Sequence, residues 1–197
     1  MHGAATGPWV FDDWLSAWPG DDVRVPDLQA GLDVVRASMT DYADRVVAAV
    51  GGEPAIVCGW SMGGLVAMMA AARCRLAGLV VIEPSVTAEV GGRDPDWPLE
   101  TGSYDSAAVY GPSVPGMRHR PESLLARAER KRGISVPGLA CPMLVVGGRD
   151  YLEDRARPTA EHYGADLLEF GDLGHYRLMV DPRVRAAIGD WIDGLRP

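Results

Sequence analysis

A serine stands between glycines in the stretch GWSMGG, residues 59–64, where a buried strand is expected to turn into a helix. The apolar run AIVC precedes this stretch, and the run LVAMMAAARC, rich in small residues, follows it. A tight turn of this kind strains the backbone of its central residue and exposes its side chain, and glycines two positions away allow strand and helix to pack closely. Ser61 is therefore a candidate nucleophile. The alternative interpretation is a tight turn with an incidental serine.

A serine hydroxyl becomes a nucleophile only when a base accepts its proton and an acid holds that base in the right tautomer. Asp150 follows the strand-like run MLVVGGR, and His175 follows LLEFGDLG. Both fall at strand ends, on the same edge of the predicted sheet as Ser61, and the chain order serine, acid, histidine is the one expected for such a turn. We expect Asp150 to be the acid. Glu83, which closes the preceding strand, is the alternative acid.

Other polar residues compete less well for these roles. Asp154 lies one helical turn into the element that follows Asp150. His162 lies late in a helix that we expect to be solvated, and His119 lies in a basic segment. We interpret both histidines as surface residues.

The elements that must position these side chains alternate between strand and helix. Strands are predicted at 54–60, 76–85 and 141–150, and a strand followed by a loop is predicted over 165–175. A short further candidate, VRVPDL, lies at 23–28. Helices are predicted at 9–18, 38–50, 62–74, 121–133, 151–164 and 181–195. Strands that are apolar throughout and alternate with helices indicate a mostly parallel sheet with helices on both faces. The predicted fold class is α/β, a three-layer sandwich, with ligands bound at the carboxyl ends of the strands.

Residues 86–141 interrupt this alternation with many prolines and glycines and one clear helix. Connections of this length are usually functional or disordered. We expect a single domain over residues 1–197, with 86–141 as a small lid or cap insertion beside the ligand. The basic run RAERKR, residues 127–132, is interpreted as a solvated helix face rather than a phosphate site.

Composition excludes several classes of function. The formal charge is −8, whereas a nucleic-acid-binding protein needs a basic face. No apolar run is long enough for a membrane span, and no signal peptide is recognisable. Three scattered cysteines favour reduced thiols in a cytoplasmic protein over a disulfide framework or a zinc site. Without a metal-ligand cluster or a phosphate-cradling loop, we expect no metal and no cofactor, and the oligomeric state is not predicted.

The sequence resembles the α/β-hydrolase family over almost its whole length. HGAATGPWVFDDW is similar to that family's oxyanion loop and first helix, GWSMGG to its nucleophile elbow, VVGGRD to its acid turn and GDLGH to its histidine loop. The resemblance implies that the backbone N–H groups of Ala4 and Met62 form the oxyanion hole. One such donor contributes about 3 kcal/mol of transition-state stabilisation.

The sequence departs from the family at its start. In the family the HG pair ends an apolar strand inside the sheet, whereas this sequence begins MHG and lacks that strand. We expect that the sequence starts too late and that an LLVHG-like strand precedes it. The alternative is a minimal form with a poorly anchored oxyanion loop.

The predicted chemistry is attack by Ser61 on a carbonyl, with an acyl-enzyme intermediate. The expected substrate is a small molecule, an ester or thioester of a small, mostly apolar acid, in a pocket lined by Trp9, Trp60 and Trp97. For Trp9, a place in the core is an equally good interpretation. Two alternatives stay open: a cofactor-free lyase or carbon–carbon bond hydrolase on the same triad, and a non-catalytic module that binds a small ligand.

Overall fold

The computed structural model describes residues 1–18, 22–53, 55–110 and 117–195. Within these residues the main sheet has four strands in the spatial order β1, β2, β5, β6, and each neighbouring pair is parallel. The strands are β1 (Ala55–Trp60), β2 (Leu76–Ile82), β5 (Met143–Gly148) and β6 (Asp166–Phe170). The carboxyl ends of these parallel strands meet at one edge, where sequence analysis places the candidate site.

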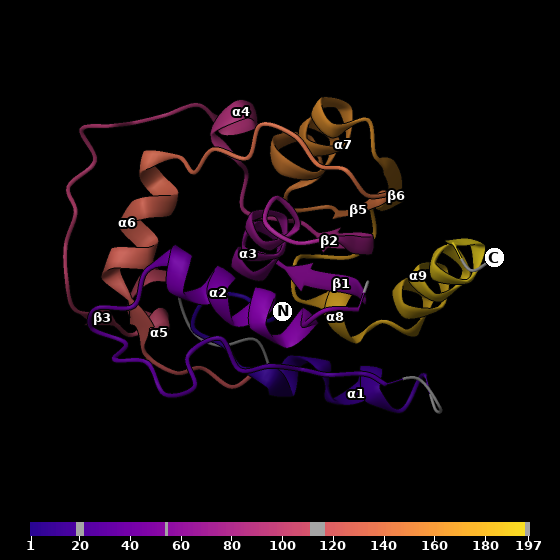
Figure 1. Ribbon diagram of the computed structural model, residues 1–197, viewed down its shortest axis with the longest axis horizontal. Coiled ribbons are helices and arrows are strands. Elements are labelled where there is room, and N and C mark those ends of the chain that lie inside the picture. Colours follow the sequence, from indigo (N-terminus) through magenta and orange to yellow (C-terminus); the bar gives the residue numbers. More distant parts are fainter. Residues whose placement is uncertain (19–21, 54, 111–116, 196–197) are drawn as a thin grey trace.

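Helices cover both faces of the sheet (Figure 1). One face carries α2 (Met39–Val50), α3 (Met62–Ala71) and α7 (Arg157–Tyr163), which follows the π-helical turn η2 (Leu152–Ala156). The other carries the 3-10 turn η1 (Pro8–Phe11), α1 (Asp12–Leu15), α8 (Arg177–Val180) and α9 (Pro182–Leu195). The predicted α/β fold with three layers is confirmed.

Alternate residues of the central strands face opposite layers, as the pleat of a strand requires. In β2, Leu79 and Val81 belong to the core cluster under α2 and α3, whereas Val80 and Ile82 belong to the cluster under α8 and α9. All four are fully buried. A strand buried on both faces must be apolar throughout, which explains the continuous apolar runs in the sequence.

Two predicted elements differ from the structure near the N-terminus. VRVPDL, residues 23–28, is not a strand: Pro26 has no N–H to donate, and the N–H of Leu28 donates to Nε2 of His2 at 3.1 Å instead of pairing with a strand. The helix predicted at 9–18 is divided into η1 and the short α1. The indole of Trp14 in α1 is buried and donates to the carbonyl of Met179 at 2.7 Å, which ties this segment to α8.

The segment predicted as a lid, residues 86–141, lies between β2 and β5 in the chain. It contains α4 (Ala88–Gly91), β3 (Ser103–Tyr104), α5 (Ser106–Tyr110), β4 (Glu122–Ser123) and α6 (Leu124–Arg132), and β3 pairs with β4 in an antiparallel ribbon. Figure 1 shows α6, α5 and β3 at one end of the molecule and α9 at the other. The function of this segment as a lid stays a prediction.

The first residues of the chain lie beside the end of β1. The N–H of Trp60 donates to the carbonyl of Met1 at 3.0 Å, and the Met1 amine contacts the carbonyl of Cys58. β1 is one of the two edge strands of the four-stranded sheet, and an apolar groove of about 700 Å³ lies beside it. None of the described helices is long and apolar enough to traverse a bilayer.

Candidate active site

Ser61 occupies the turn between β1 and α3 in a conformation that few residues other than glycine adopt. Its φ is +56° and its ψ is −121°. The neighbouring chain holds this strained turn in place, because the N–H of Ser61 donates to the carbonyl of Ile82 and the N–H of Ser85 donates to the carbonyl of Ser61, both at 2.9 Å. Strain of this kind persists only where the surroundings impose it, and it is concentrated at functional sites. The predicted strained turn is confirmed.

The glycines of the motif are required by close packing. A Cβ at Gly59 would lie 2.3 Å from the carbonyl oxygen of Gly63, and a Cβ at Gly63 would lie 2.3 Å from the carbonyl oxygen of Met1. Neither contact is possible without movement of the backbone. The small residues therefore allow β1, α3 and the first residues of the chain to meet around Ser61.

The acid that contacts the imidazole of His175 is Glu83. Nδ1 of His175 lies 2.5 Å from Oε2 of Glu83, and the other carboxylate oxygen accepts hydrogen bonds from the N–H groups of Gly148 at 2.7 Å and Tyr151 at 3.3 Å. The Glu83 side chain has no exposed surface. Because Nδ1 donates to the carboxylate, Nε2 is the nitrogen free to accept a proton from a nucleophile.

Asp150, the acid predicted from the sequence, is placed differently. Its Oδ2 accepts a hydrogen bond from the backbone N–H of His175 at 2.8 Å, and among the described residues it makes no hydrogen bond to the imidazole. Its side chain is 42% exposed and lies 3.6 Å from Nε of Arg149. The order of the strands explains the difference. β2 lies between β1 and β5, so the long side chain of Glu83, just after β2, reaches His175. Asp150 lies beyond the end of β5. Of the two candidate acids, Glu83 is therefore the one that contacts the imidazole, and the catalytic role of either acid stays a prediction.

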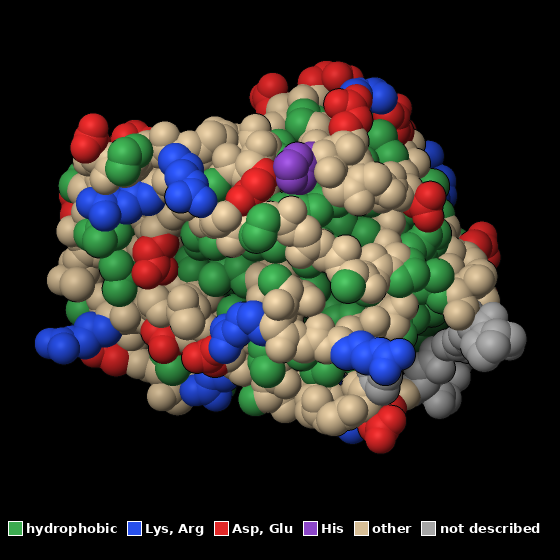
Figure 2. Space-filling model, turned by 45° about the horizontal axis from the view of Figure 1, so that its top comes forward, with side chains coloured by type: hydrophobic (Ala, Val, Ile, Leu, Met, Phe, Trp, Pro, Cys, Tyr) green, Lys and Arg blue, Asp and Glu red, His purple; other side chains and the backbone are tan. Residues whose placement is uncertain are grey.

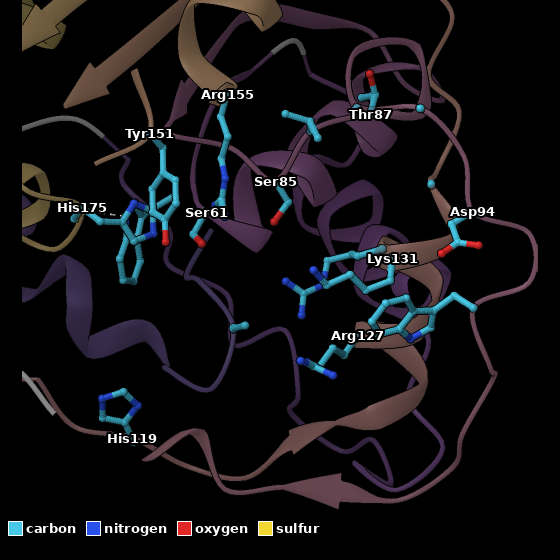
Figure 3. Close-up of a pocket in the computed structure, with 18 of the residues that line it drawn as sticks. Ser61, Ser85, Thr87, Asp94, His119, Arg127, Lys131, Tyr151, Arg155 and His175 are labelled. Atoms are coloured by element: carbon cyan, nitrogen blue, oxygen red, sulfur yellow. Dashed lines mark hydrogen bonds between the residues drawn. The ribbon is translucent and has the colours of Figure 1, made fainter. Parts of the chain in front are cut away.

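Two aromatic rings hold the imidazole of His175. The Trp60 ring lies 4.9 Å from it, centroid to centroid, and the Tyr151 ring meets it edge-on at 5.1 Å. The indole of Trp60 also donates to the carbonyl of His175 at 3.2 Å. Figure 3 shows Ser61, His175 and Tyr151 grouped on one side of a cavity that all three line.

The loop predicted to form the oxyanion hole is tied to the inserted segment. Ala5 has a φ of +55°, and its N–H donates to Oε2 of Glu122 at 2.8 Å. Oε1 of the same buried carboxylate accepts from the hydroxyl of Tyr42 at 2.6 Å. The N–H of Arg120 donates to the carbonyl of Ala5 at 2.9 Å. Strand β4 and the residues before it thus fix the conformation of this loop, an anchor that is not predicted from the sequence.

Both predicted oxyanion donors lie close to the serine in the chain or in space. Ala4 lines the cavity together with Ser61, and Met62 is the first residue of α3. The first N–H groups of a helix have no acceptor within the helix, so they are available to an anion. The oxyanion role of both residues stays a prediction.

A second anchor of the loop is formed by the buried His2. Nδ1 of His2 contacts the carbonyl of Gly3 at 3.0 Å, and its Nε2 lies 3.1 Å from Nη2 of Arg120. Arg120 in turn makes a bidentate pair with Asp27, with contacts of 2.8 and 2.5 Å. The hydrogen bonds from Arg120 hold the pKa of Asp27 well below its usual range.

The cavity beside Ser61 has a volume of about 610 Å³. Of the predicted pocket residues, Trp60 and Trp97 line it. Trp9 is not among the lining residues: its indole donates to the carbonyl of Arg118 at 3.2 Å and packs under the guanidinium groups of Arg118 and Arg120. Its ring therefore packs against the inserted segment, residues 86–141, and not against the cavity.

Several cavity residues escaped sequence analysis. His119, interpreted as a surface residue, lines the cavity, as do Tyr151 and four basic residues, Arg127, Arg130, Lys131 and Arg155. The spacing of the three basic residues in α6 places them on one face of the helix, a signal present in the sequence.

Figure 2 shows hydrophobic side chains on the floor of a hollow, with Lys and Arg side chains at its border. Among the described residues, no group of three or more His, Cys, Asp or Glu side chains is arranged to hold a metal ion.

Comparison with known proteins decides the family. The sequence model of the Alpha/beta hydrolase family matches residues 1–188. The chain belongs to this family. No curated protein sequence matches it.

Solved structures of alpha/beta hydrolases resemble this family member over nearly its full length. Methylketone synthase I from tomato has a TM-score of 0.70 at 13% identity, with 100% of this chain and 96% of that chain covered. Polyneuridine aldehyde esterase has a TM-score of 0.64 at 17% identity, with 96% of each chain covered. A pyrethroid hydrolase from Sphingobium faniae has a TM-score of 0.65 at 18% identity, with 98% and 95% covered. At such low identity these similarities establish the fold alone.

Proposed function

We propose that this alpha/beta hydrolase is a serine hydrolase that cleaves an ester or thioester through an acyl-enzyme. Ser61 is the nucleophile, His175 is the base, and Glu83 orients His175. The observation that carries the proposal is the 2.5 Å contact between Glu83 and Nδ1 of His175, together with the strained Ser61, which lines the same cavity as His175. The names of the similar structures, an esterase and a pyrethroid hydrolase among them, agree with it.

The reaction begins when Oγ of Ser61 attacks the carbonyl carbon and Nε2 of His175 accepts the hydroxyl proton. The tetrahedral oxyanion accepts hydrogen bonds from the N–H groups of Ala4 and Met62. When the intermediate collapses, the carbon–oxygen or carbon–sulfur bond breaks, and the alcohol or thiol leaves with the proton from His175. Water then attacks the acyl-enzyme, with His175 as base, and releases the acid and free Ser61. Throughout, the buried Glu83 carboxylate stabilises the imidazolium.

The acyl group is expected to be small, because Trp60 and Trp97 flank a cavity of about 610 Å³. Such a volume suits a small-molecule substrate. The steps above use only residues of the chain, so the proposed reaction requires no cofactor.

The proposal is tested by treating the protein with a fluorophosphonate probe and measuring its intact mass, together with turnover of p-nitrophenyl butyrate. We expect a single adduct and measurable turnover in the unaltered protein, and neither in Ser61→Ala. His175→Ala should lose the adduct as well, since the hydroxyl then has no base. A folded protein that forms no adduct and turns over no ester would overturn the proposal.

The same experiment separates the alternatives. A carbon–carbon hydrolase or cofactor-free lyase would form the adduct without rapid ester turnover. A binding module would form no adduct and would still bind its ligand after Ser61→Ala. The two measurements therefore distinguish an inert serine from an activated serine with a different substrate.

A further inference from the structure

The cavity beside Ser61 is cationic on one side. Arg127, Arg130 and Lys131 of α6 line it, spaced three and four residues apart on one helix face, and Arg155 of η2 lines it from another wall. Figure 3 shows Arg127 and Lys131 across the cavity from His175 and Tyr151. Among the described lining residues, Asp94 is the single carboxylate. This concentration of positive charge contrasts with the net charge of −8 of the whole chain.

In the part of the chain that the structure describes, these basic side chains form no ion pair with a carboxylate. The ion pairs of the described residues include other arginines but none of these four. Instead, the Arg155 guanidinium lies 3.6 Å from the Tyr151 ring centroid, and the Lys131 ammonium lies 5.5 Å from that of Trp97. Nη2 of Arg130 is buried, with no hydrogen-bond partner among the described residues. Donors placed in this way remain available to a ligand.

Like charges gathered in one cavity repel each other, and a buried guanidinium N–H without an acceptor costs free energy. An anion in the cavity would relieve both. Arginine is well suited to this task, because its planar fork binds carboxylate and phosphate oxygens in pairs while its face stacks on an aromatic ring. The run RAERKR, interpreted from sequence as a solvated helix face, therefore contributes three residues to the cavity wall.

We propose that the substrate of this site carries an anionic group, a carboxylate or a phosphate, which Arg127, Arg130 and Lys131 bind while the scissile carbonyl lies at Ser61. The inference rests on the proposed function for its catalytic part. It changes the expected substrate from an ester or thioester of a small, mostly apolar acid to an ester or thioester with an anionic end.

The test compares two matched pairs of substrates. Mono-p-nitrophenyl glutarate and p-nitrophenyl pentanoate differ by a carboxylate in place of a methyl group, on the acyl side. Butyryl-coenzyme A and S-butyryl-N-acetylcysteamine differ by the phosphate-bearing part of the leaving group. We expect kcat/KM to be roughly tenfold higher for the anionic member of one pair, as for a hydrogen bond to a charged group. The pair that shows the preference identifies the source of the anion.

The double variant Arg127→Gln/Lys131→Gln should lower that anionic preference roughly tenfold, and added salt should weaken it in the unaltered protein. Arg75→Gln is the matched control, because Arg75 is an exposed arginine just before β2, at the opposite end of that strand from Glu83. It removes one positive charge from a residue that does not line the cavity and should leave the preference as it was. The inference would be overturned if, in both pairs, kcat/KM for the neutral substrate equals or exceeds that for its anionic partner and the double variant leaves this ratio unaltered. The proposed hydrolase function would still stand.

A binding measurement covers the case in which the hydrolase function fails. Calorimetry on the Ser61→Ala protein with glutarate and with coenzyme A reports anion binding without catalysis. Saturable binding of one of them that the double variant loses and Arg75→Gln keeps supports the anion site, even in a protein that forms no fluorophosphonate adduct. Absence of binding for both anions, with no anionic preference in turnover, would refute it.

Discussion

Glu83 and His175 are joined by a 2.5 Å contact between Oε2 and Nδ1, although 92 residues separate them in the chain. Glu83 has a φ of +38° and is fully buried at the end of β2, where two backbone N–H groups also bind its carboxylate. These contacts fix the carboxylate before any substrate arrives. Asp150, by contrast, holds the loop that carries His175 through a backbone hydrogen bond. The two acids that compete in the sequence thus have different tasks in the structure.

Replacing each acid by its amide separates these tasks. We expect Glu83→Gln to lower kcat by about 10⁴-fold, because the imidazole loses the partner that sets its tautomer and stabilises its charge. Asp150→Asn keeps an acceptor for the His175 N–H and should lower kcat by roughly tenfold or less, since one exposed hydrogen bond is weakened. Turnover of p-nitrophenyl butyrate measures both. If Asp150→Asn proves the more damaging change, the assignment of Glu83 as the acid is wrong.

Glu122 is expected to position the oxyanion loop. Glu122→Ala leaves the buried N–H of Ala5 and the hydroxyl of Tyr42 without their acceptor, which should cost about 1–3 kcal/mol of stability per group and lower kcat more than it raises KM. Glu129→Ala is the matched control. Its carboxylate, in the same segment, accepts from the N–H of Met39 at 2.6 Å, at the start of α2 and away from the loop.

Urea unfolding and steady-state kinetics distinguish the two glutamates. Both variants should be less stable than the unaltered protein, but only Glu122→Ala should lower kcat beyond what the loss of folded protein explains. Slower labelling by a fluorophosphonate in Glu122→Ala would agree with a displaced oxyanion loop. Equal kinetic effects in both variants would mean that Glu122 contributes stability alone.

Much of the fold and part of the site follow from sequence because their signals are local. The continuous apolar runs predict buried parallel strands, and Ser38 caps α2 as its position before an amphipathic run indicates. Ser61 and His175 are predicted as site residues because a strand-to-helix turn and a strand end each have a recognisable pattern. Glu83 and Asp150 cannot be separated in this way, since both follow strands. Their difference depends on which strands are neighbours and on how far each side chain reaches, and neither is encoded locally.

The pair formed by Asp27 and Arg120 should make stability depend on pH. The pKa of Asp27 is held below its usual range in the folded protein, chiefly by the hydrogen bond from Arg120, whereas in the unfolded chain it is about 3.9. The folded state therefore binds fewer protons, so the stabilisation is full above about pH 5 and is lost as the pH falls below about 4. Asp27→Asn should cost about 1–3 kcal/mol at pH 7, and this difference from the unaltered protein should shrink at pH 3.5.

Urea unfolding at both pH values gives this difference directly. Asp44→Asn is the control, because Asp44 pairs with Arg73 on the surface, where side chains about half exposed on both partners limit the pair to less than about 1 kcal/mol. A loss for Asp27→Asn that is the same at pH 7 and pH 3.5 would show that the charge of Asp27 contributes nothing to the anchor.

The packing around the nucleophile turn predicts a sharp contrast between two glycines. Gly59→Ala places a Cβ 2.3 Å from the carbonyl oxygen of Gly63 and 2.8 Å from Cα of Gly64, so α3 must move away from β1. Overpacking of this kind costs about 1–3 kcal/mol of stability. The shift also moves Ser61 away from His175, so turnover should fall at least tenfold in the protein that still folds.

Gly52 is the control. At Gly52 an added Cβ meets nothing within 4 Å, and Gly52→Ala should change stability by about 0.5 kcal/mol at most. Thermal unfolding and fluorophosphonate labelling of both variants test the contrast. A Gly59→Ala protein that labels as fast as Gly52→Ala would show that the site does not depend on this close contact.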